Sequence, residues 1–556
     1  MAVAAPAHAN YHDHIHPEPT NFVQKYIFSL DHKIIGIQYF ITTFIFYCIA
    51  GLLAEVIRVQ LLHPTGGFVS NEVYNQVYSV HGSAMVWLVI IPMLTGGFGN
   101  FVMPLMIGAR DVAFPWLNMA SFWMFPVAGA LLFSSFLVGA PEAGWTEYPP
   151  ISLQGPPGTS LWCMAIFLVG VSSTLTGINF LVTIMKMRAP GMTLTRMPLF
   201  VWAQLATAML SMVATTALAG ALLALFLERT FGVPFYDPSK GGSPLLWQHM
   251  FWFYSHPAVY IMILPAFGIV SEILPTFTRK PLFGYKAVAF SSVGIALVGF
   301  MVWAHHMFTS GMVPWLTLPF MILTFFVAVP TGVKVLAWIA TLWGGRIRFT
   351  AAMLFSLGLI ATFTLGGITG VFLAAVPADL HEHGTYFVVA HFHYVLFGGS
   401  VFGIFAGMYF WWPKMTGKLM SERLAVAHFW ATFIGFNLTF FPMHWLGLMG
   451  MPRRVPIYDQ QFQSLNVLAS IGSFILALST LLFFANVAYS LTKGKKASSD
   501  PWGARTLEWM ISSPPPYYNF KKIPSVLALP YDFGEPLPYV GGDLIRPNPQ
   551  SKFAGE

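Results

Sequence analysis

Two histidines one residue apart, His391 and His393, stand in the apolar run V-V-A-H-F-H-Y-V-L-F. Residues i and i+2 of a helix point about 200° apart, so these imidazoles leave opposite faces, with Phe392 between them. They cannot share a metal ion without breaking the helix, but each can serve a separate cofactor. Because ionisable groups at membrane depth are costly and usually functional, the pair predicts a two-cofactor enzyme.

Further histidines also lie in apolar segments: His81 in H-G-S-A-M-V-W, His256 in Y-S-H-P-A-V-Y, and His305 with His306 in V-W-A-H-H-M-F. One such histidine alone more often packs between helices with a hydrogen-bond partner, but six together favour a metal enzyme. Three imidazoles suit copper or another borderline metal with an open position for substrate, and we assign His256, His305 and His306 to it. The other three suit axial heme ligation, with one heme closed by two histidines and the other open.

Tyr260 follows His256 by four residues, so the two side chains share one helix face. A phenol beside a copper ion could give an electron and a proton together. Tyrosines are also common at membrane interfaces. The position one turn from a predicted metal ligand favours a catalytic role.

The composition predicts an all-α integral membrane protein. Hydrophobic residues make up 56% of the chain and charged residues 9%, whereas soluble domains have about 25% charged residues. Twelve apolar runs approach the ~20 residues needed to span a bilayer, which predicts one twelve-helix bundle over 30–491. A polar tail, 1–29, precedes it and an extension, 492–556, follows it. The predicted spans are 30–57, 73–106, 117–139, 161–186, 197–227, 246–274, 286–308, 316–343, 350–375, 384–412, 424–448 and 464–491.

Lysines and arginines gather in alternate loops and after the last span, as at Lys186, Arg188 and Lys493, whereas loop 140–160 contains none. The positive-inside rule therefore places both termini in the cytoplasm. The net charge of +7 reflects this bias rather than nucleic-acid binding.

Two cysteines, Cys48 and Cys163, lie in separate apolar spans. We expect them to be buried, which excludes a dithiolate copper centre within this chain. Four histidines near the N-terminus have no fixed spacing or partner set, so a disordered tail is predicted there rather than a metal site. They are His8, His12, His14 and His16.

Arg453 and Arg454 form a pair in G-M-P-R-R-V-P, on the side otherwise poor in positive charge. They are either two solvated loop residues or a bidentate site for carboxylates such as heme propionates.

The motifs together resemble subunit I of the type-A heme–copper oxygen reductases, the family of the cytochrome c oxidases. The resemblance covers roughly residues 20–525 and rests on D-H-K-I-I-G, T-G-G-F-G-N, H-P-A-V-Y, W-A-H-H-M-F-T-S-G-M, P-T-G-V-K-V, V-V-A-H-F-H-Y-V-L, G-M-P-R-R and T-L-E-W-M-I-S-S-P-P-P. It implies a terminal respiratory oxidase that reduces O2 to water with electrons from cytochrome c and takes up and pumps protons. It also implies a subunit II with a dinuclear copper centre, a subunit III, small subunits, and a multi-pass place in the bacterial cytoplasmic membrane.

The resemblance assigns roles to matching residues. The low-spin heme a would lie between His81 and His393, and heme a3 on His391. Copper B would be held by His256, His305 and His306, with Tyr260 cross-linked to His256. The hemes would be surrounded by Arg58, Trp145, Phe392, Arg453 and Arg454.

Lys334 stands deep in an apolar span, where a lysine costs about 2.5–3.5 kcal/mol on insertion scales. By resemblance it belongs to a K-pathway for protons, together with Thr331 and Ser271. Asp111 lies in a short loop, where a carboxylate is usually solvated. By resemblance it is the mouth of a D-pathway, which continues through Asn100, Asn118, Ser172, Ser173, Asn179, Tyr254 and Ser255.

Two departures from the family pattern matter. Many relatives carry glutamate where this chain has Ala258, and Tyr254 with Ser255 indicates the tyrosine–serine subtype. A tyrosine has a reference pKa of ~10 against ~4.3 for glutamate, so relay through hydroxyl and water is favoured over ionisation. Relatives also often have His-Asp where this chain has His383-Gly384, so a magnesium site at His383 is doubtful, with Glu382 as a possible substitute ligand.

Three alternatives remain open. A quinol oxidase of the same superfamily is disfavoured by Leu62 and Val73, where some quinol users have an acidic residue and a histidine. A nitric-oxide reductase would leave Tyr260 and both proton pathways unexplained. A twelve-span transporter fits the span count, but not the histidine set with the arginine pair.

Overall fold

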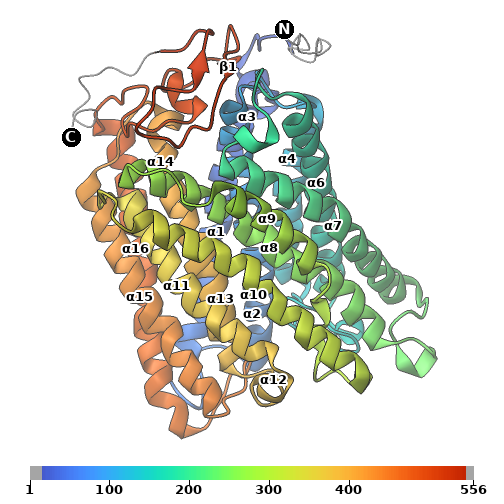
Figure 1. The fold of residues 1–556 in the computed structure, drawn as a ribbon. Helices are drawn as coiled ribbons and strands as arrows, with labels where there is room; N and C mark the ends of the chain where they lie inside the picture. Colours follow the sequence, from blue (N-terminus) through green and yellow to red (C-terminus); the bar gives the residue numbers. More distant parts are fainter. Residues whose placement is uncertain (1–15, 546–556) are drawn as a thin grey trace.

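The structure is a computed structural model that describes residues 16–545, and it is a bundle of long helices (Figure 1). The long helices are α1 His32–Gln60, α4 Pro115–Ser134, α6 Gly158–Lys186, α7 Leu199–Phe231, α8 Pro244–Thr278, α10 Pro314–Leu342, α11 Ala351–Ala374, α15 Glu422–Leu448 and α16 Gln463–Lys493. The shorter ones are α2 Asn71–Ser83, α3 Asn100–Ile107, α5 Ile151–Gln154, α9 Tyr285–Gly299, α12 Val376–Glu382, α13 Tyr386–Val395 and α14 Phe402–Thr416. Wider π turns, Ala84–Ile90 and Pro92–Gly99, join α2 to α3, and another, Leu396–Val401, joins α13 to α14.

Within residues 16–545, eleven helical stretches are long and apolar enough to cross a membrane. This confirms the predicted helical membrane bundle. The predicted span 286–308 differs, because α9 has only 15 residues. It ends at Gly299, a poor helix former, and the chain then makes a short 3-10 turn, Trp303–Met307. That turn carries His305 and His306.

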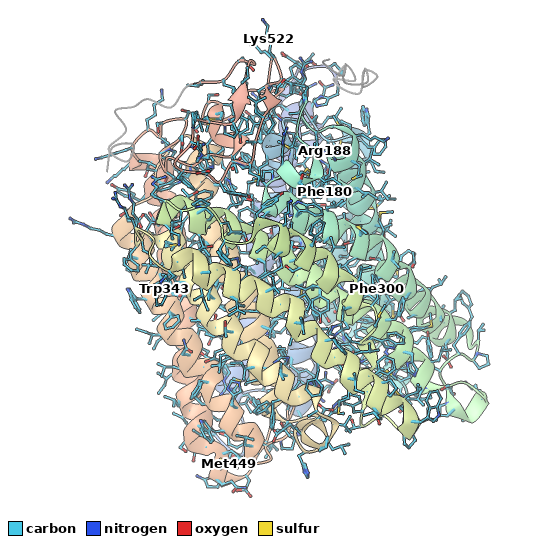
Figure 2. The ribbon with its side chains drawn as sticks, viewed as in Figure 1. Phe180, Arg188, Phe300, Trp343, Met449 and Lys522 are labelled. Carbon is cyan, nitrogen blue, oxygen red and sulfur yellow. The ribbon has the colours of Figure 1, made fainter. Side chains whose placement is uncertain are left out.

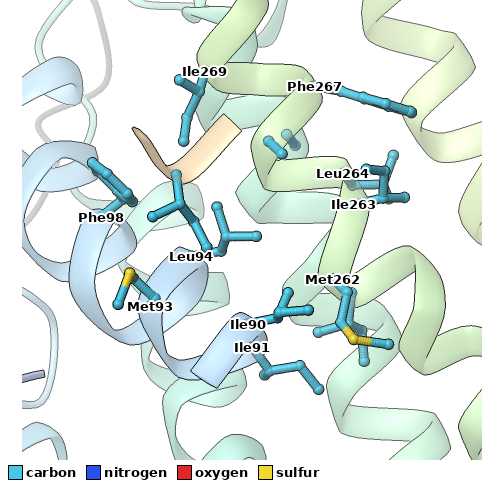
Figure 3. Close-up of a cluster of buried hydrophobic side chains, with 14 of the residues drawn as sticks. Ile90, Ile91, Met93, Leu94, Phe98, Met262, Ile263, Leu264, Phe267 and Ile269 are labelled. Carbon is cyan, nitrogen blue, oxygen red and sulfur yellow. The ribbon is translucent and has the colours of Figure 1, made fainter. Parts of the chain in front are cut away.

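The centre of the bundle is formed by the stretch Asn71–Ile107 and by α8. In their most apolar 18-residue segments, 89% and 94% of the residues are buried. By contrast, only 11% of the residues in the corresponding segment of α10 are buried, so α10 lies at the periphery. Figure 3 shows Ile90 beside Met262 of α8 and Leu94 below Ile269 of the same helix. This packing holds α8, which carries His256, against the stretch Asn71–Ile107, which carries His81.

The C-terminal extension folds back over one end of the bundle. The amide of Asn519 donates to the carbonyl of Ala109 at 2.9 Å, and its nitrogen lies 2.7 Å from His32 Nε2. The extension contains the only strands within residues 16–545, β1 Ser525–Val526 and β2 Tyr539–Val540, which pair antiparallel. In Figure 2, Lys522 of this extension and Met449 lie at opposite ends of the molecule.

The predicted disorder at His16 is wrong. His16 is buried, its Nε2 lies 2.8 Å from Asp111 Oδ2, and its carbonyl accepts a hydrogen bond from the Tyr518 hydroxyl at 3.1 Å. Burial alone would lower the pKa of His16, but the hydrogen bond and negative charge of Asp111 outweigh it and raise the pKa above its ordinary value. Both ends of the described chain therefore meet at one end of the bundle; His8, His12 and His14 lie outside the described residues.

Candidate heme and copper site

A cavity of about 1360 Å³ lies inside the bundle and is lined by all six predicted ligand histidines. Drug-sized pockets usually measure about 300–1,000 Å³, so this one has room for more than one large group. The histidines come from four elements: α2, α8, α13 and the 3-10 turn after α9. They are His81, His256, His305, His306, His391 and His393.

Three imidazoles converge in one wall of the cavity. His256 Nδ1 lies 3.2 Å from His306 Nε2, and His305 Nε2 lies 3.1 Å from the same atom. One ring nitrogen of each residue lies within 4.8 Å of the others, and within residues 16–545 this is the only such group of three potential ligands. Three neutral imidazoles with an open fourth side fit a copper ion that binds substrate.

Tyr260 lies beside this cluster, as the i, i+4 spacing predicted. Its hydroxyl is 2.6 Å from His256 Nε2, whereas His256 Nδ1 faces the other two histidines. A metal ion at the cluster would therefore be linked to the phenol through one imidazole.

Two residues that the sequence reasoning missed hold the cluster in place. Trp252 stacks on His306, with ring centroids 3.7 Å apart and planes 11° apart, and its indole N–H donates to the Tyr148 hydroxyl. The Thr324 hydroxyl lies 3.0 Å from His305 Nδ1. The signal for Trp252 was its place four residues before His256, on the same helix face. No sequence signal marks Thr324, which comes from another helix.

The remaining three histidines share one hydrogen-bond pattern. The Nδ1 atoms of His81, His391 and His393 lie 2.8, 3.0 and 2.8 Å from the carbonyl oxygens of Ala50, Gly366 and Val389. This pattern fixes the ring orientation and leaves Nε2 free for a metal, as is usual for ligating histidines. It fits axial ligation of heme iron.

The opposite directions of His391 and His393 also agree with the prediction from spacing. His391 lies against α11, where a Cβ on Gly370 would come within 2.8 Å of its ring. His393 instead stacks on Phe440 of α15, with ring centroids 4.1 Å apart. Phe392 lines the cavity beside both. The two imidazoles therefore serve different parts of one cavity.

The arginines and Trp145 also line this cavity. Burial lowers the pKa of Arg453 to about 10, and the charge of Arg454 adds to the effect. Within residues 16–545 no carboxylate forms a salt bridge with either residue. Both arginines are half-buried, and a guanidinium pair that has no carboxylate partner fits the propionates of a heme. Arg58 instead donates to the Asn466 carbonyl at 2.7 Å and to Ser470.

Lys334 is 2% exposed and donates to the Val288 carbonyl at 2.9 Å and to the Ser292 hydroxyl at 2.7 Å. Thr331 lines the cavity one turn away. Ser271 instead accepts from the Trp338 indole at 3.0 Å and donates to the Phe267 carbonyl at 2.8 Å. Ser292, a partner that the sequence reasoning missed, lies in the span predicted at 286–308.

The predicted D-pathway residues fall into two groups. Both amide atoms of Asn118, Oδ1 of Asn100 and Oγ of Ser255 are buried without a hydrogen-bond partner among residues 16–545. Tyr254 is also buried, at 3% exposure. The other members differ. Asn179 makes hydrogen bonds with the backbone N–H and carbonyl of Phe114, Ser172 donates to the Ser121 carbonyl, and Ser173 is half-buried.

The doubtful magnesium position has few ligands. His383 Nδ1 lies 3.0 Å from Asp379 Oδ2, and Glu382 accepts from the Thr385 hydroxyl. Gly384 has a positive φ of 77° and offers no side chain. The described residues thus offer one imidazole and two carboxylates here, but these do not converge into a group of three potential metal ligands.

Comparison with known proteins defines the class first. The fold resembles a solved structure described as a heme-copper terminal oxidase dimer, with a TM-score of 0.68 and 20% identity over 84% of this chain and 85% of that one. Residues 34–475 match the family described as Cytochrome C and Quinol oxidase polypeptide I. This is a membrane-spanning oxidase subunit.

The relatives narrow the assignment. The chain is 54% identical to cytochrome c oxidase subunit 1 of Thermostichus vulcanus over 93% of this chain and 94% of that protein. It is 53% identical to the same subunit of Synechocystis sp. and 47% identical to that of Bacillus subtilis over 91% of this chain and 82% of that protein. The chain belongs to the cytochrome c and quinol oxidase polypeptide I family. It is the catalytic, multi-pass subunit of a multi-subunit terminal oxidase, whose cofactors are a low-spin heme, heme a3 and copper B.

Proposed function

We propose that this chain reduces O2 to water with electrons from cytochrome c and couples the reaction to proton uptake and pumping. One observation carries the proposal: the three-imidazole cluster, with the Tyr260 hydroxyl within hydrogen-bond distance of His256, shares a cavity with His391, whose ring is oriented for a heme. When bound, the hemes and copper supply the electron transfer and the O2 binding. The chain supplies the geometry and the protons.

Each residue then has a definite task. His81 and His393 hold the low-spin heme, His391 holds heme a3, and the cluster of His256, His305 and His306 holds copper B. Tyr260 can release a proton and an electron from its hydroxyl toward the cluster. Arg453, Arg454 and Trp145 would lie near the heme propionates, Arg58 near the formyl group of heme a, and Phe392 between the two hemes.

Protons for the reaction come from the end of the bundle where the termini meet, which the loop charges place in the cytoplasm. Lys334, with Thr331 and Ser271, would lead to Tyr260. Asp111 would feed a water chain along Asn118 and Asn100 toward Tyr254 and Ser255. The buried, unpartnered amide and hydroxyl atoms on that side support the second route, because such atoms are usually satisfied by ordered water.

Electron transfer into this subunit requires a partner. Cys48 and Cys163 lie on α1 and α6, so this chain lacks a dithiolate pair. A subunit II with a dinuclear copper centre, beside a subunit III and small subunits, completes the complex in a bacterial cytoplasmic membrane. The relatives named cytochrome c oxidase support cytochrome c as donor.

The first test is O2 uptake by the purified complex with reduced cytochrome c and then with a soluble quinol. We expect uptake with cytochrome c alone, and loss of uptake in Tyr260→Phe with the heme spectrum retained. Uptake driven by quinol alone would contradict the proposed donor, and Leu62 and Val73 would then be poor guides. A colourless complex would contradict the whole proposal.

A further inference from the structure

Glu147 is a carboxylate that the proposed reaction does not use. It lies in the loop between α4 and α6, at the end of the bundle opposite the termini. Its side chain is fully buried, and its Oε2 has no hydrogen-bond partner among residues 16–545. Its φ of 40° lies in the left-handed region, which non-glycine residues rarely adopt. The loop thus holds the Glu147 carboxylate away from water and in an unfavourable backbone conformation.

The position of Glu147 separates two cavities. Its neighbours Trp145, Thr146 and Tyr148 line the large cavity that contains the histidines. Glu147 itself lines a second cavity of about 400 Å³. The loop is therefore a thin wall, and the buried acid stands in it.

The second cavity carries two further acids of increasing exposure. Glu142 is half-buried and accepts from the Gln76 amide at 3.0 Å, and Glu72 is exposed. Both line the cavity with Glu147. The three carboxylates form a series from the interior to the surface. They do not converge as metal ligands would, because the histidine cluster is the only group of three potential ligands so arranged within residues 16–545.

Charged and titratable groups from several elements act on Glu147. Arg229 of α7 and Arg454 favour its ionised form, as does the Ala143 N–H, which donates to Oε1 at 3.0 Å. Glu142 opposes ionisation, and Tyr78 of α2 and Cys163 of α6 also interact with the carboxylate electrostatically. Burial outweighs the favourable charges and raises the pKa of Glu147 to about 8. Such a group can bind and release a proton near neutral pH.

We propose that Glu147 is a proton-binding site in the exit route of the oxidase. A proton from the large cavity binds Oε2, and the same proton then passes by way of Glu142 and Glu72 to the water outside. No other bond is made or broken, and no electron moves. The inference rests on the proposed function as a proton-pumping oxidase and adds where the pumped protons leave.

The test compares Glu147→Gln with the wild-type complex in lipid vesicles. Glutamine keeps an oxygen for the Ala143 N–H but cannot exchange a proton, so a purely structural role would survive the change. Glu535→Gln, an exposed acid at the opposite end, is the matched control. We expect Glu147→Gln to lower proton ejection per electron to about half or less, while O2 uptake in uncoupled vesicles stays within about twofold. Glu535→Gln should leave both unchanged.

A second readout does not need turnover. In the infrared spectrum of the wild type, the C=O band of a protonated carboxyl should titrate with the outside pH, and Glu147→Gln should lack it. Loss of that band in Glu147→Gln supports the proton-binding site whether or not the wild type pumps protons. A wild type that does not pump protons would contradict the proposed function and not the proton-binding site. An unchanged band, or wild-type proton ejection by Glu147→Gln, overturns the inference. If that variant does not assemble, Glu147→Asp decides: a shifted band with reduced ejection supports the site, and wild-type values of both overturn it.

Discussion

The Lys334 region and the Asp111 region both lie between the termini-bearing end and the large cavity, but they treat buried polar atoms in opposite ways. Lys334 makes two hydrogen bonds within the protein, to the Val288 carbonyl and the Ser292 hydroxyl. Beyond Asp111, both amide atoms of Asn118 and Oγ of Ser255 lack a protein partner among residues 16–545. Buried polar atoms without partners cost about 1–3 kcal/mol each, so they indicate room for ordered water.

The difference teaches that the two routes would move protons by different means. On the Asp111 side, a chain of water held by amides and hydroxyls can pass protons without side-chain movement. On the Lys334 side, one ammonium group must break two bonds before it can transfer a proton. A single substitution should therefore disable the lysine route, whereas the water route should degrade by steps.

The largest effect is expected for Lys334→Met, which keeps the stem and removes the only titratable group of that route. Turnover with cytochrome c should fall about 100-fold, the scale of a lost acid–base group. The heme spectrum should be unchanged, because Lys334 contacts none of the ligand histidines. Ser292→Ala is the matched control, since the Val288 carbonyl remains, and its loss should be far smaller. An equal loss of turnover in Lys334→Met and Ser292→Ala would contradict the view that one ammonium group carries the protons of this route.

The next effect is expected for Asn118→Leu, which replaces two unpartnered amide atoms by methyl groups of similar size. If the amide binds water, turnover should fall about tenfold because the chain is interrupted. If it binds none, the change should be neutral or stabilising, since it removes an unsatisfied polar group. Turnover and thermal unfolding of the same sample separate these outcomes. Wild-type turnover with a raised unfolding temperature would contradict the water route.

A smaller effect is expected at the inner end of the water route, where Tyr254 and Ser255 lie. Tyr254→Phe should impair turnover more than Ser255→Ala, by about five- to tenfold, because Tyr254 lies one helical turn before Ala258 and its hydroxyl would relay protons in place of the missing glutamate. Both residues are buried on α8, at 3% and 1% exposure, so the pair is matched for location. Equal O2-reduction rates for the wild type and Tyr254→Phe would contradict the assignment.

The histidine set could be predicted from the sequence because each member stands in an apolar run and the i, i+2 and i, i+4 spacings fix directions on a helix. The turn that carries His305 and His306 could not, because hydropathy does not distinguish a long helix from a short one followed by a 3-10 turn. Ser292 and Thr324 could not be predicted either, because their contacts cross between helices. The prediction that His16 is disordered was wrong for the same reason, because its partners Asp111 and Tyr518 lie 95 and 502 residues away in the sequence.

The smallest effect concerns the mouth of the Asp111 route, which His16 covers, whereas Lys334 has no partner from either end of the described residues 16–545. Because the pKa of His16 is raised, its positive charge and the ion pair with Asp111 are present at low pH and are lost as the pH rises through that pKa. The N-terminal segment should then detach more readily at about pH 9 than at about pH 6.

Trypsin can report this detachment, since Lys25 is exposed and is the first lysine or arginine of the chain. Release of the peptide that ends at Lys25, measured by mass spectrometry, should be a few-fold faster at the higher pH in the wild type. It should be independent of pH in His16→Gln, after correction with a small peptide substrate for the pH dependence of trypsin itself. A pH-independent rate in the wild type would mean that the ion pair does not hold the segment, and the two routes would then differ in their interior alone.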